Sequence, residues 1–338
     1  MFCNMPCVDL SPLRQREPSP KGNMGFGIKG QDGIVKFLRS AIRNNRVSHA
    51  YIFAGPEGSG RALLARDFAK ALNCADARNA PCGSCLSCLK IERDIHPEVT
   101  WIRGGGKSGQ IGVDKVRELE RRVALKPYEG RYKVCVLVNA HFMTVEAANS
   151  FLKTLEEPPL NSVFVLIAEK ISQLPSTVVS RCQVLRLKPI RPEELSSILV
   201  SDYGMDRKKA EFISRFSEGR LGRALGYGKD VLGWKNSVLD EFSGDECAEN
   251  YTPADRKKLA EKLNVLASWY RDILVFKAAP DEDLLIHSDR LGDIERYSRQ
   301  YGQDELVSMF ESVLSAKENI MSNVNPKLAL SAMLKEFR

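Results

Sequence analysis

The chain has no run of about 18 apolar residues, so the sequence does not predict a membrane-spanning helix. Its N-terminus lacks a charged segment followed by an apolar core, so a secretory signal is not expected either. Histidine occurs only four times, with no two at the spacing of metal ligands, and no Ser/His/Asp or Cys/His triad can be picked out. These absences leave a protein that we expect in the cytoplasm and without a nucleophilic triad.

Length and composition set the outer limits of the fold. With 338 residues, 43% of them hydrophobic and 28% charged, the chain is long enough for two or three domains with buried cores. A net charge of +7 favours anionic partners, but it is modest for this length and could equally serve solubility. Residues 1–23, with four prolines and little periodicity, are expected to be a disordered extension or a start upstream of Met24.

A phosphate-binding loop is present without its usual lysine. The pattern G-x-x-x-x-G-K-[ST] is matched at Gly55 and Gly60, with Gly58 between them, but Arg61 and Ala62 stand where lysine and a hydroxyl residue belong. Arginine is a bulky planar fork rather than a compact ammonium, and alanine has no oxygen for Mg²⁺. The loop therefore predicts an ATPase fold that no longer hydrolyses ATP.

The sequence around this loop supports the motif. Residues 50–54 form a short apolar strand candidate before it, and apolar positions recur at helical spacing over residues 62–72 after it. A second buried strand, residues 133–138, ends in Asn139, where a hydrolysing P-loop enzyme would present acidic residues. Two catalytic positions are thus expected to be missing together, although this segment could also be a simple core strand and turn.

Further strands and helices alternate along the same region. Thr144 is a plausible N-cap for a helix that Pro158 must stop, and strand candidates follow at residues 163–168 and 184–187. Alternation of this kind predicts an α/β domain with a parallel sheet covered by helices on both faces.

Four of the nine cysteines fall within fifteen residues, as Cys74, Cys82, Cys85 and Cys88. Two-residue gaps let neighbouring thiolates point at one ion, and four thiolates favour a closed, structural Zn²⁺ site. A redox pair at Cys85 and Cys88, or at Cys82 and Cys85, is the competing interpretation, but it leaves two cysteines unexplained.

Residues from Pro192 onward are expected to be helical. Glycines punctuate a compact region to about residue 232, and the polar stretch 243–250 is the best linker candidate. Beyond it, apolar stripes at residues 259–274 and 306–314 are typical of helices packed in a core or between subunits.

Several motifs together give a family resemblance that no single one would carry. They are Ser48-His49-Ala50-Tyr51, the inserted cysteines, His96-Pro97-Glu98, the run from Ala147 to Pro159, Ser180-Arg181-Cys182 and Asn325-Pro326-Lys327-Leu328-Ala329-Leu330. With these motifs, which span residues 24–230 and a C-terminal stretch, the chain resembles bacterial clamp-loader subunits of the AAA+ class, the assembly that works with DNA polymerase III.

The resemblance implies roles for particular residues. In that family the arginine of a Ser-Arg-Cys motif enters the neighbouring subunit's ATP site, and Arg181 is the match; it could otherwise be a surface arginine. Arg223 resembles a lid arginine placed near nucleotide, although with this loop it could merely pack the lid. The adjacent Glu156 and Glu157 point about 100° apart on a helix and are interpreted as helix-end residues rather than a catalytic pair.

The resemblance also implies an architecture and partners. It predicts an AAA+ α/β domain over residues 24–190 with the cysteine module at 74–88, a helical lid over 191–242 and an all-α collar over 251–338. The expected function is that of a non-hydrolysing subunit of the polymerase III holoenzyme, working with motor subunits of the gamma or tau type, a delta subunit, the sliding clamp and primer–template DNA.

Two rival functions stay open on the sequence alone. One is a competent clamp-loader ATPase of the gamma or tau type that tolerates Arg61 and Asn139. The other is a zinc-dependent DNA-binding module, for which no basic helix with interleaved aromatic residues stands out near the cysteines.

Overall fold

The fold was established from a computed structural model that describes residues 25–105, 109–228, 230–242 and 255–337. The predicted N-terminal extension (1–23) and the predicted linker (243–250) lie outside the described residues. Two compact units are formed. The described residues up to 194, together with 219–223, make up what we call the sheet unit; the other described residues make up the helical unit.

The sheet unit is built on five strands that are all parallel, as predicted. Their spatial order is β2-β3-β4-β1-β5. The strands are β1 (Ala50–Ala54), β2 (Val99–Ile102), β3 (Lys133–Leu137), β4 (Ser162–Ala168) and β5 (Gln183–Arg186). Because β4 lies between β1 and β3, segments that follow β1, β3 and β4 meet at one edge of the sheet.

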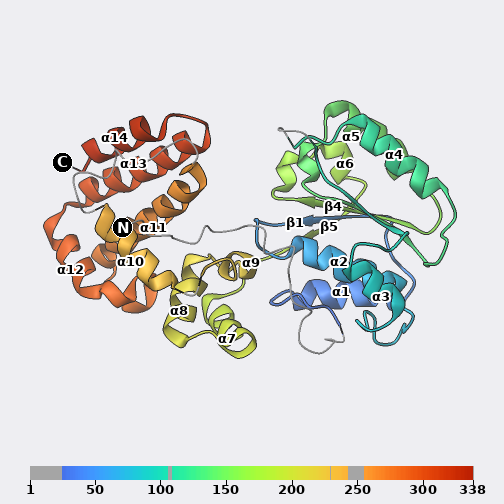
Figure 1. Cartoon of the computed structure of the whole chain (residues 1–338), viewed down its shortest axis with the longest axis horizontal. Coiled ribbons are helices and arrows are strands. Elements are labelled where there is room, and N and C mark those ends of the chain that lie inside the picture. Colours follow the sequence, from blue (N-terminus) through green and yellow to red (C-terminus); the bar gives the residue numbers. More distant parts are fainter. Residues whose placement is uncertain (1–24, 106–108, 229, 243–254, 338) are drawn as a thin grey trace, which may run out of the picture. The chain divides into compact units, whose positions relative to one another are not determined.

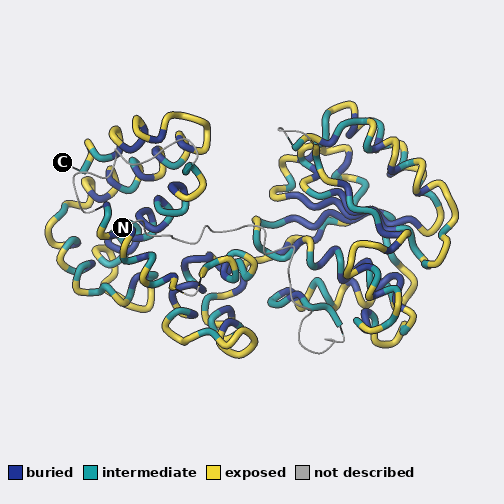
Figure 2. The backbone as a smooth tube through the Cα atoms, viewed as in Figure 1, coloured by how far each residue is buried: buried dark blue, intermediate teal, exposed yellow. Residues whose placement is uncertain are grey.

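Helices cover both faces of this sheet, again as predicted (Figure 1). In β1, Ala50, Ile52 and Ala54 face one core and Tyr51 and Phe53 face the other, which is the alternation expected of a strand. The first core is closed by α4 (Val113–Ala124), α5 (Val145–Glu156) and α6 (Ser176–Val179), and the second by α1 (Asp32–Arg43), α2 (Arg61–Asn73) and α3 (Leu86–Glu92). The central strands β3, β4 and β1 are buried on both faces (Figure 2), whereas β5, at one side of the sheet, buries only Leu185.

Helix α5 begins and ends where the sequence predicts. The Thr144 hydroxyl oxygen accepts a hydrogen bond from the Ala147 amide at 3.2 Å, which satisfies one of the free N–H groups of the first turn. The helix ends at Glu156, two residues before Pro158. Short 3₁₀ turns, η2 (Ala140–Phe142) and η3 (Ile171–Gln173), follow β3 and β4.

The C-terminal region is helical throughout its described residues. Its elements are α7 (Pro192–Tyr203), α8 (Arg207–Phe216), α9 (Leu221–Ala224), α10 (Val231–Glu241), α11 (Arg256–Ala278), η6 (Glu282–Leu284), η7 (Ser288–Arg290), α12 (Leu291–Gln300), α13 (Gln303–Met321) and α14 (Pro326–Lys335). Helix α11 packs against α10, α12 and α13, and α14 packs against α13. The predicted apolar stripe on α11 is buried, as Leu259, Leu263 and Ile273 show. None of the described helices combines the length and the apolar character that crossing a membrane requires.

Candidate nucleotide loop, exposed arginine and cysteine cluster

The modified phosphate-binding loop joins β1 to α2, which is the strand–loop–helix setting that the motif requires. Gly58 and Gly60 have φ angles of 82° and 92°, in the left-handed region that favours glycine. The Gly55 amide donates to the Ala168 carbonyl at 3.3 Å, which fixes the start of the loop to the end of β4. The loop therefore has the strand–loop–helix setting and the glycine conformations that the motif requires, although the residues at its two key side-chain positions differ.

The segment 219–223 lies directly against this loop. The Gly222 amide donates to the Gly58 carbonyl at 2.8 Å. A Cβ on Gly58 would lie 2.9 Å from the Arg223 nitrogen, and one on Gly222 would lie 2.8 Å from the Gly58 oxygen, so both positions require glycine. The structure thus places Arg223 beside the loop, and the contact runs through the backbone.

Arg61 is almost completely buried, with 9% of its surface exposed, and its Nη1 has no hydrogen-bond partner among the described residues. Burial lowers the pKa of its guanidinium, and the nearby carboxylates Glu169 and Glu57 oppose that shift. Ala62 follows without any side-chain oxygen. A cation is present at the start of α2, but the hydroxyl that would bind Mg²⁺ is absent.

The tip of β3 carries no carboxylate, as predicted. Asn139 adopts a left-handed conformation with φ 54°, and His141 follows in η2. Burial lowers the pKa of His141, which Glu169 opposes and Arg61 reinforces. Glu169, directly after β4, therefore acts electrostatically on both Arg61 and His141, and it lies one strand away from the tip of β3.

Arg181 lies at the other edge of the sheet. It precedes β5, whereas the P-loop follows the carboxyl end of β1, and β1 and β5 are parallel neighbours. Its Nη2 donates to Glu156 Oε1 at 2.6 Å, and its Nη1 donates to the Thr177 carbonyl at 3.0 Å. The arginine side chain is 35% exposed. Arg181 is thus partly exposed, held by a surface ion pair, and separated from the chain's own P-loop.

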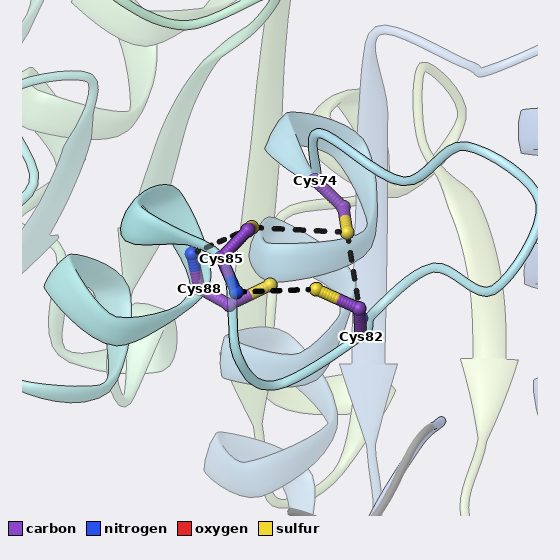
Figure 3. Close-up of side chains that lie close together, drawn as sticks. All are labelled: Cys74, Cys82, Cys85 and Cys88. Atoms are coloured by element: carbon purple, nitrogen blue, oxygen red, sulfur yellow. Dashed lines mark hydrogen bonds between the residues drawn. The ribbon is translucent and has the colours of Figure 1, made fainter.

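The four clustered cysteines come together in space (Figure 3). Their Sγ atoms all lie within 4.8 Å of one another, and Cys74 and Cys85 are 4.0 Å apart. Four thiolates around one Zn²⁺ at about 2.3 Å would stand roughly 3.8 Å from each other, so the cluster fits a tetrahedral ion with a small contraction. Cys74 follows the end of α2, while Cys85 caps α3 and Cys88 lies within its first turn.

Backbone amides surround the sulfur atoms. The amides of Cys82, Cys85 and Cys88 point at the sulfurs of Cys74, Cys82 and Cys85, at 3.4, 3.3 and 3.5 Å. Burial alone would raise the pKa of Cys82, but hydrogen bonds from Cys85 and Ser84 lower it to about 6. Amide donors of this kind stabilise thiolates, which are the form of cysteine that binds metal. All four sulfurs also share one small volume, which favours a metal centre over a redox pair of two cysteines.

The contacts of two acidic residues at these sites were not predicted from the sequence. Glu156 is a helix-end residue, as predicted, and the structure also pairs it with Arg181. Glu169 carried no motif, although its place directly after a buried strand is a signal for a residue at a sheet edge. The sequence does not show that Glu156 meets Arg181 or that Glu169 acts on Arg61 and His141, because both relations depend on which strands and helices are neighbours.

Sequence comparisons relate the chain to replication proteins. The pattern of the family described as "DNA polymerase III, delta subunit" matches residues 30–191, and that of "DNA polymerase III, delta subunit, C terminal" matches residues 247–338. The delta' subunit of DNA polymerase III from Bacillus subtilis is 30% identical over 310 residues, covering 87% of this chain and 92% of that protein. The tau subunit from the same organism is 25% identical, covering 89% of this chain but only 59% of that protein.

A structural neighbour is a "dna polymerase iii, gamma subunit-related protein" from Thermotoga maritima. It has a TM-score of 0.41 and 18% identity, and the similarity covers 88% of this chain and 98% of that one.

Proposed function

The chain belongs to the DNA polymerase III delta-subunit family, and from this premise we propose that it is the delta-prime-type subunit of a clamp loader. In this role it assists the ATP-driven loading of a sliding clamp onto primed DNA without hydrolysing ATP itself. Its partners would be motor subunits of the gamma or tau type, a delta subunit, the clamp and primer–template DNA. Its compartment would be the cytoplasm, where a bacterial replication complex works.

The observation that carries the non-hydrolysing role is the combination of Arg61, Ala62 and Asn139. The side chains that would bind the β- and γ-phosphates, coordinate Mg²⁺ and orient water are replaced at all three positions. The hydrogen bond from Gly222 to Gly58 also holds the segment 219–223 directly against the loop. We therefore expect nucleotide to bind poorly, if at all, in the chain's own site.

We propose Arg181 as an arginine finger that acts on a neighbouring subunit. Its place at the sheet edge opposite the chain's own P-loop supports action in trans, since it precedes β5 while the loop follows β1. Its partial exposure supports access to another protein. A finger supplied in this way is worth about 10³–10⁵ in rate, enough to make a non-hydrolysing subunit necessary for hydrolysis next door.

We also propose that Cys74, Cys82, Cys85 and Cys88 hold one structural Zn²⁺. Bound there, the ion would cross-link the end of α2 to the start of α3 and leave no open position for a substrate. The domain division proposed is an α/β domain over 24–190, a lid over 191–242, to which Arg223 belongs, and a collar over 251–338.

The test compares ATP hydrolysis by the isolated protein with hydrolysis after addition of a motor subunit, clamp and primed DNA. We expect the isolated protein to hydrolyse ATP only at the background rate. We expect the complete mixture to hydrolyse ATP faster than the motor subunit does without this protein. Arg181→Ala should leave assembly intact and remove most of the stimulation. Arg122→Ala is a matched control, because Arg122 also forms an exposed ion pair, with Glu118 at 2.7 Å on α4, and should have little effect.

If the Arg181→Ala protein stimulated ATP hydrolysis by the motor subunit fully, the proposal that Arg181 is an arginine finger would be contradicted. Robust turnover by the isolated protein would favour the alternative function, a competent ATPase of the gamma or tau type. The higher identity to a delta' subunit and its 92% coverage, against 59% for tau, favour the first proposal.

A further inference from the structure

A groove opens at the edge of the sheet where β3 and β4 begin. Its volume is about 840 Å³, and it is lined by the ends of α1, α2 and α4, by the loop 124–132 and by residues 159–161. The P-loop lies at the opposite edge, because it follows the carboxyl end of β1 in a parallel sheet. The nucleotide-loop residues therefore do not form this groove.

The groove has an apolar floor and apolar side chains at its rim. Leu72 and Val123 are buried in the floor. Leu125 and Leu160 also line it, yet they are 67% and 92% exposed. Removing an exposed leucine side chain from water is favourable, so two exposed leucines beside a hollow favour a ligand that brings apolar groups of its own.

Cationic side chains surround this apolar region. Lys126 and Arg131 line the groove itself. A second hollow of about 120 Å³ shares Ile42 and Ala77 with it and is lined by three arginines, Arg39, Arg43 and Arg78. No aspartate or glutamate is among the residues that line either hollow. The two hollows are therefore neighbours, the larger with an apolar floor and two cations and the smaller lined by three arginines.

The nearest carboxylates in sequence are already bonded elsewhere. Asp76 accepts hydrogen bonds from the amides of Arg78 and Asn79 within its own turn. Glu129 pairs with Lys90 at 2.5 Å and faces His96 at 3.8 Å. Among the described residues, no ion pair joins Lys126, Arg131 or Arg43 to a carboxylate, so these cations lack an internal counter-charge.

We propose that this groove binds an acidic segment of a partner protein that carries a large apolar anchor residue. The anchor would lie between Leu125 and Leu160, and flanking carboxylates would face Lys126 and Arg131, with Arg43 and Arg78 further along. The volume suits one such anchor with its backbone, since ligand pockets hold roughly 300–1,000 Å³. Charge complementarity of this kind contributes mainly to specificity and association rate.

Nucleic acid fits the groove less well than such a peptide. Single strands are held by bases stacked on aromatic side chains, and Tyr132 is the one aromatic residue among those that line the groove. The floor is aliphatic, and an aliphatic floor does not recognise a phosphate backbone.

The test measures fluorescence anisotropy of labelled twelve-residue peptides with the full-length protein. The probes are a panel in which one leucine, phenylalanine or tryptophan is flanked by aspartates, the same peptides with lysine in place of aspartate, and a single-stranded oligonucleotide. We expect micromolar binding of an aspartate peptide that weakens with salt, and no binding of its lysine counterpart.

Two variants and a matched control locate the site. Lys126→Glu with Arg131→Glu should weaken binding at least about tenfold, and Leu160→Ser should weaken it severalfold, since Leu160 is almost fully exposed and its loss should not affect folding. Lys257→Glu with Lys258→Glu makes the same change of charge on the exposed start of α11 and should leave affinity within about twofold.

Three results would overturn the proposal. The first is that no aspartate peptide binds up to millimolar concentration. The second is that the α11 control variant weakens peptide binding as much as the groove variants do. The third is that only the oligonucleotide binds tightly and that the groove variants lose affinity for it. Circular dichroism of each variant separates loss of binding from loss of fold, and ATP is not used at any step.

Discussion

At the scale of single residues, the clearest contact is the ion pair between Arg181 and Glu156. The two side chains are 35% and 52% exposed, so the 2.6 Å contact is worth about 0–1 kcal/mol. If Arg181 acts on a neighbour, its guanidinium must leave Glu156 first. A pair this weak would cost little to exchange for a phosphate of a neighbouring subunit.

Replacing Glu156 tests this exchange. Glu156→Gln removes the charge but keeps the shape, and we expect ATP turnover of the assembled complex to stay equal or rise by up to about fivefold, the factor for 1 kcal/mol. The measurement is steady-state turnover with clamp and primed DNA. A loss as large as that of Arg181→Ala would show instead that Glu156 positions the finger productively.

A second residue-scale feature is the buried histidine of the helical unit. The Nε2 of His287 lies 2.8 Å from the Ser268 hydroxyl, and its ring packs edge-on against Trp269 and beside Phe212. Burial lowers its pKa well below the ordinary value, and the nearby cations Lys235, Arg290 and Arg271 lower it further. The carboxylate of Asp272, which is also buried, accepts a hydrogen bond from the backbone amide of His287 at 2.7 Å.

This histidine should make the helical unit sensitive to acid. The pKa of His287 is lowered in the folded protein, so below about pH 6.5 the unfolded chain binds a proton that the folded chain does not. The free energy of unfolding therefore decreases as the pH decreases, by up to about 1.4 kcal/mol per pH unit. His287→Gln should be less stable at pH 7 but lose this slope. Urea unfolding followed by tryptophan fluorescence, from pH 7.5 to 5.5, should show the gap between the two proteins narrowing as pH falls; parallel curves would contradict the assignment.

At the scale of elements, the cysteine cluster joins α2 to α3. Helix α3 has only seven residues and buries only Cys88 and Ile91, too little for a helix of this length to be stable by itself. We therefore expect that a metal bound by the four cysteines would supply much of what holds this module in place.

Removing one ligand tests the metal. Cys88→Ser should lower the bound zinc from one equivalent to a small fraction and expose the amides of α3 to hydrogen exchange. Cys182→Ala is the control, because burial raises the pKa of that thiol to about 12 and keeps it protonated, so zinc content should not change. Metal analysis and exchange mass spectrometry give the two readouts, and a wild-type protein without stoichiometric metal would refute the site.

At the scale of the whole molecule, the chain forms two compact units, each with its own core. Domains with separate cores commonly unfold as separate cooperative units. The cysteine cluster belongs to the sheet unit, and the His287 network belongs to the helical unit.

This division predicts two thermal transitions in calorimetry. Chelation of the metal should lower the midpoint of one transition, and Asp272→Asn, which alters the fully buried acceptor of the Ile286 and His287 amides, should lower the other by several degrees. A single transition that both changes shift equally would show that the units fold as one.

Much of this architecture was predictable because it depends on local patterns. The strand at residues 50–54, the cap at Thr144, the end of α5 before Pro158 and the parallel α/β class all followed from periodicity and turn chemistry, and the structure confirms them. The closeness of the four cysteines followed from their spacing, because short intervals restrict where the sulfurs can lie.

The sequence alone determined the missing P-loop lysine, the missing hydroxyl and the missing carboxylate, since these are identities at fixed motif positions. Only the tertiary structure decided that the charge of Glu169 acts on both Arg61 and His141, that Glu156 pairs with Arg181 at the edge opposite the P-loop, and that basic and apolar side chains from distant segments line one groove. The reason is that each of these arrangements depends on strand order and helix packing, which bring together residues that no local pattern relates.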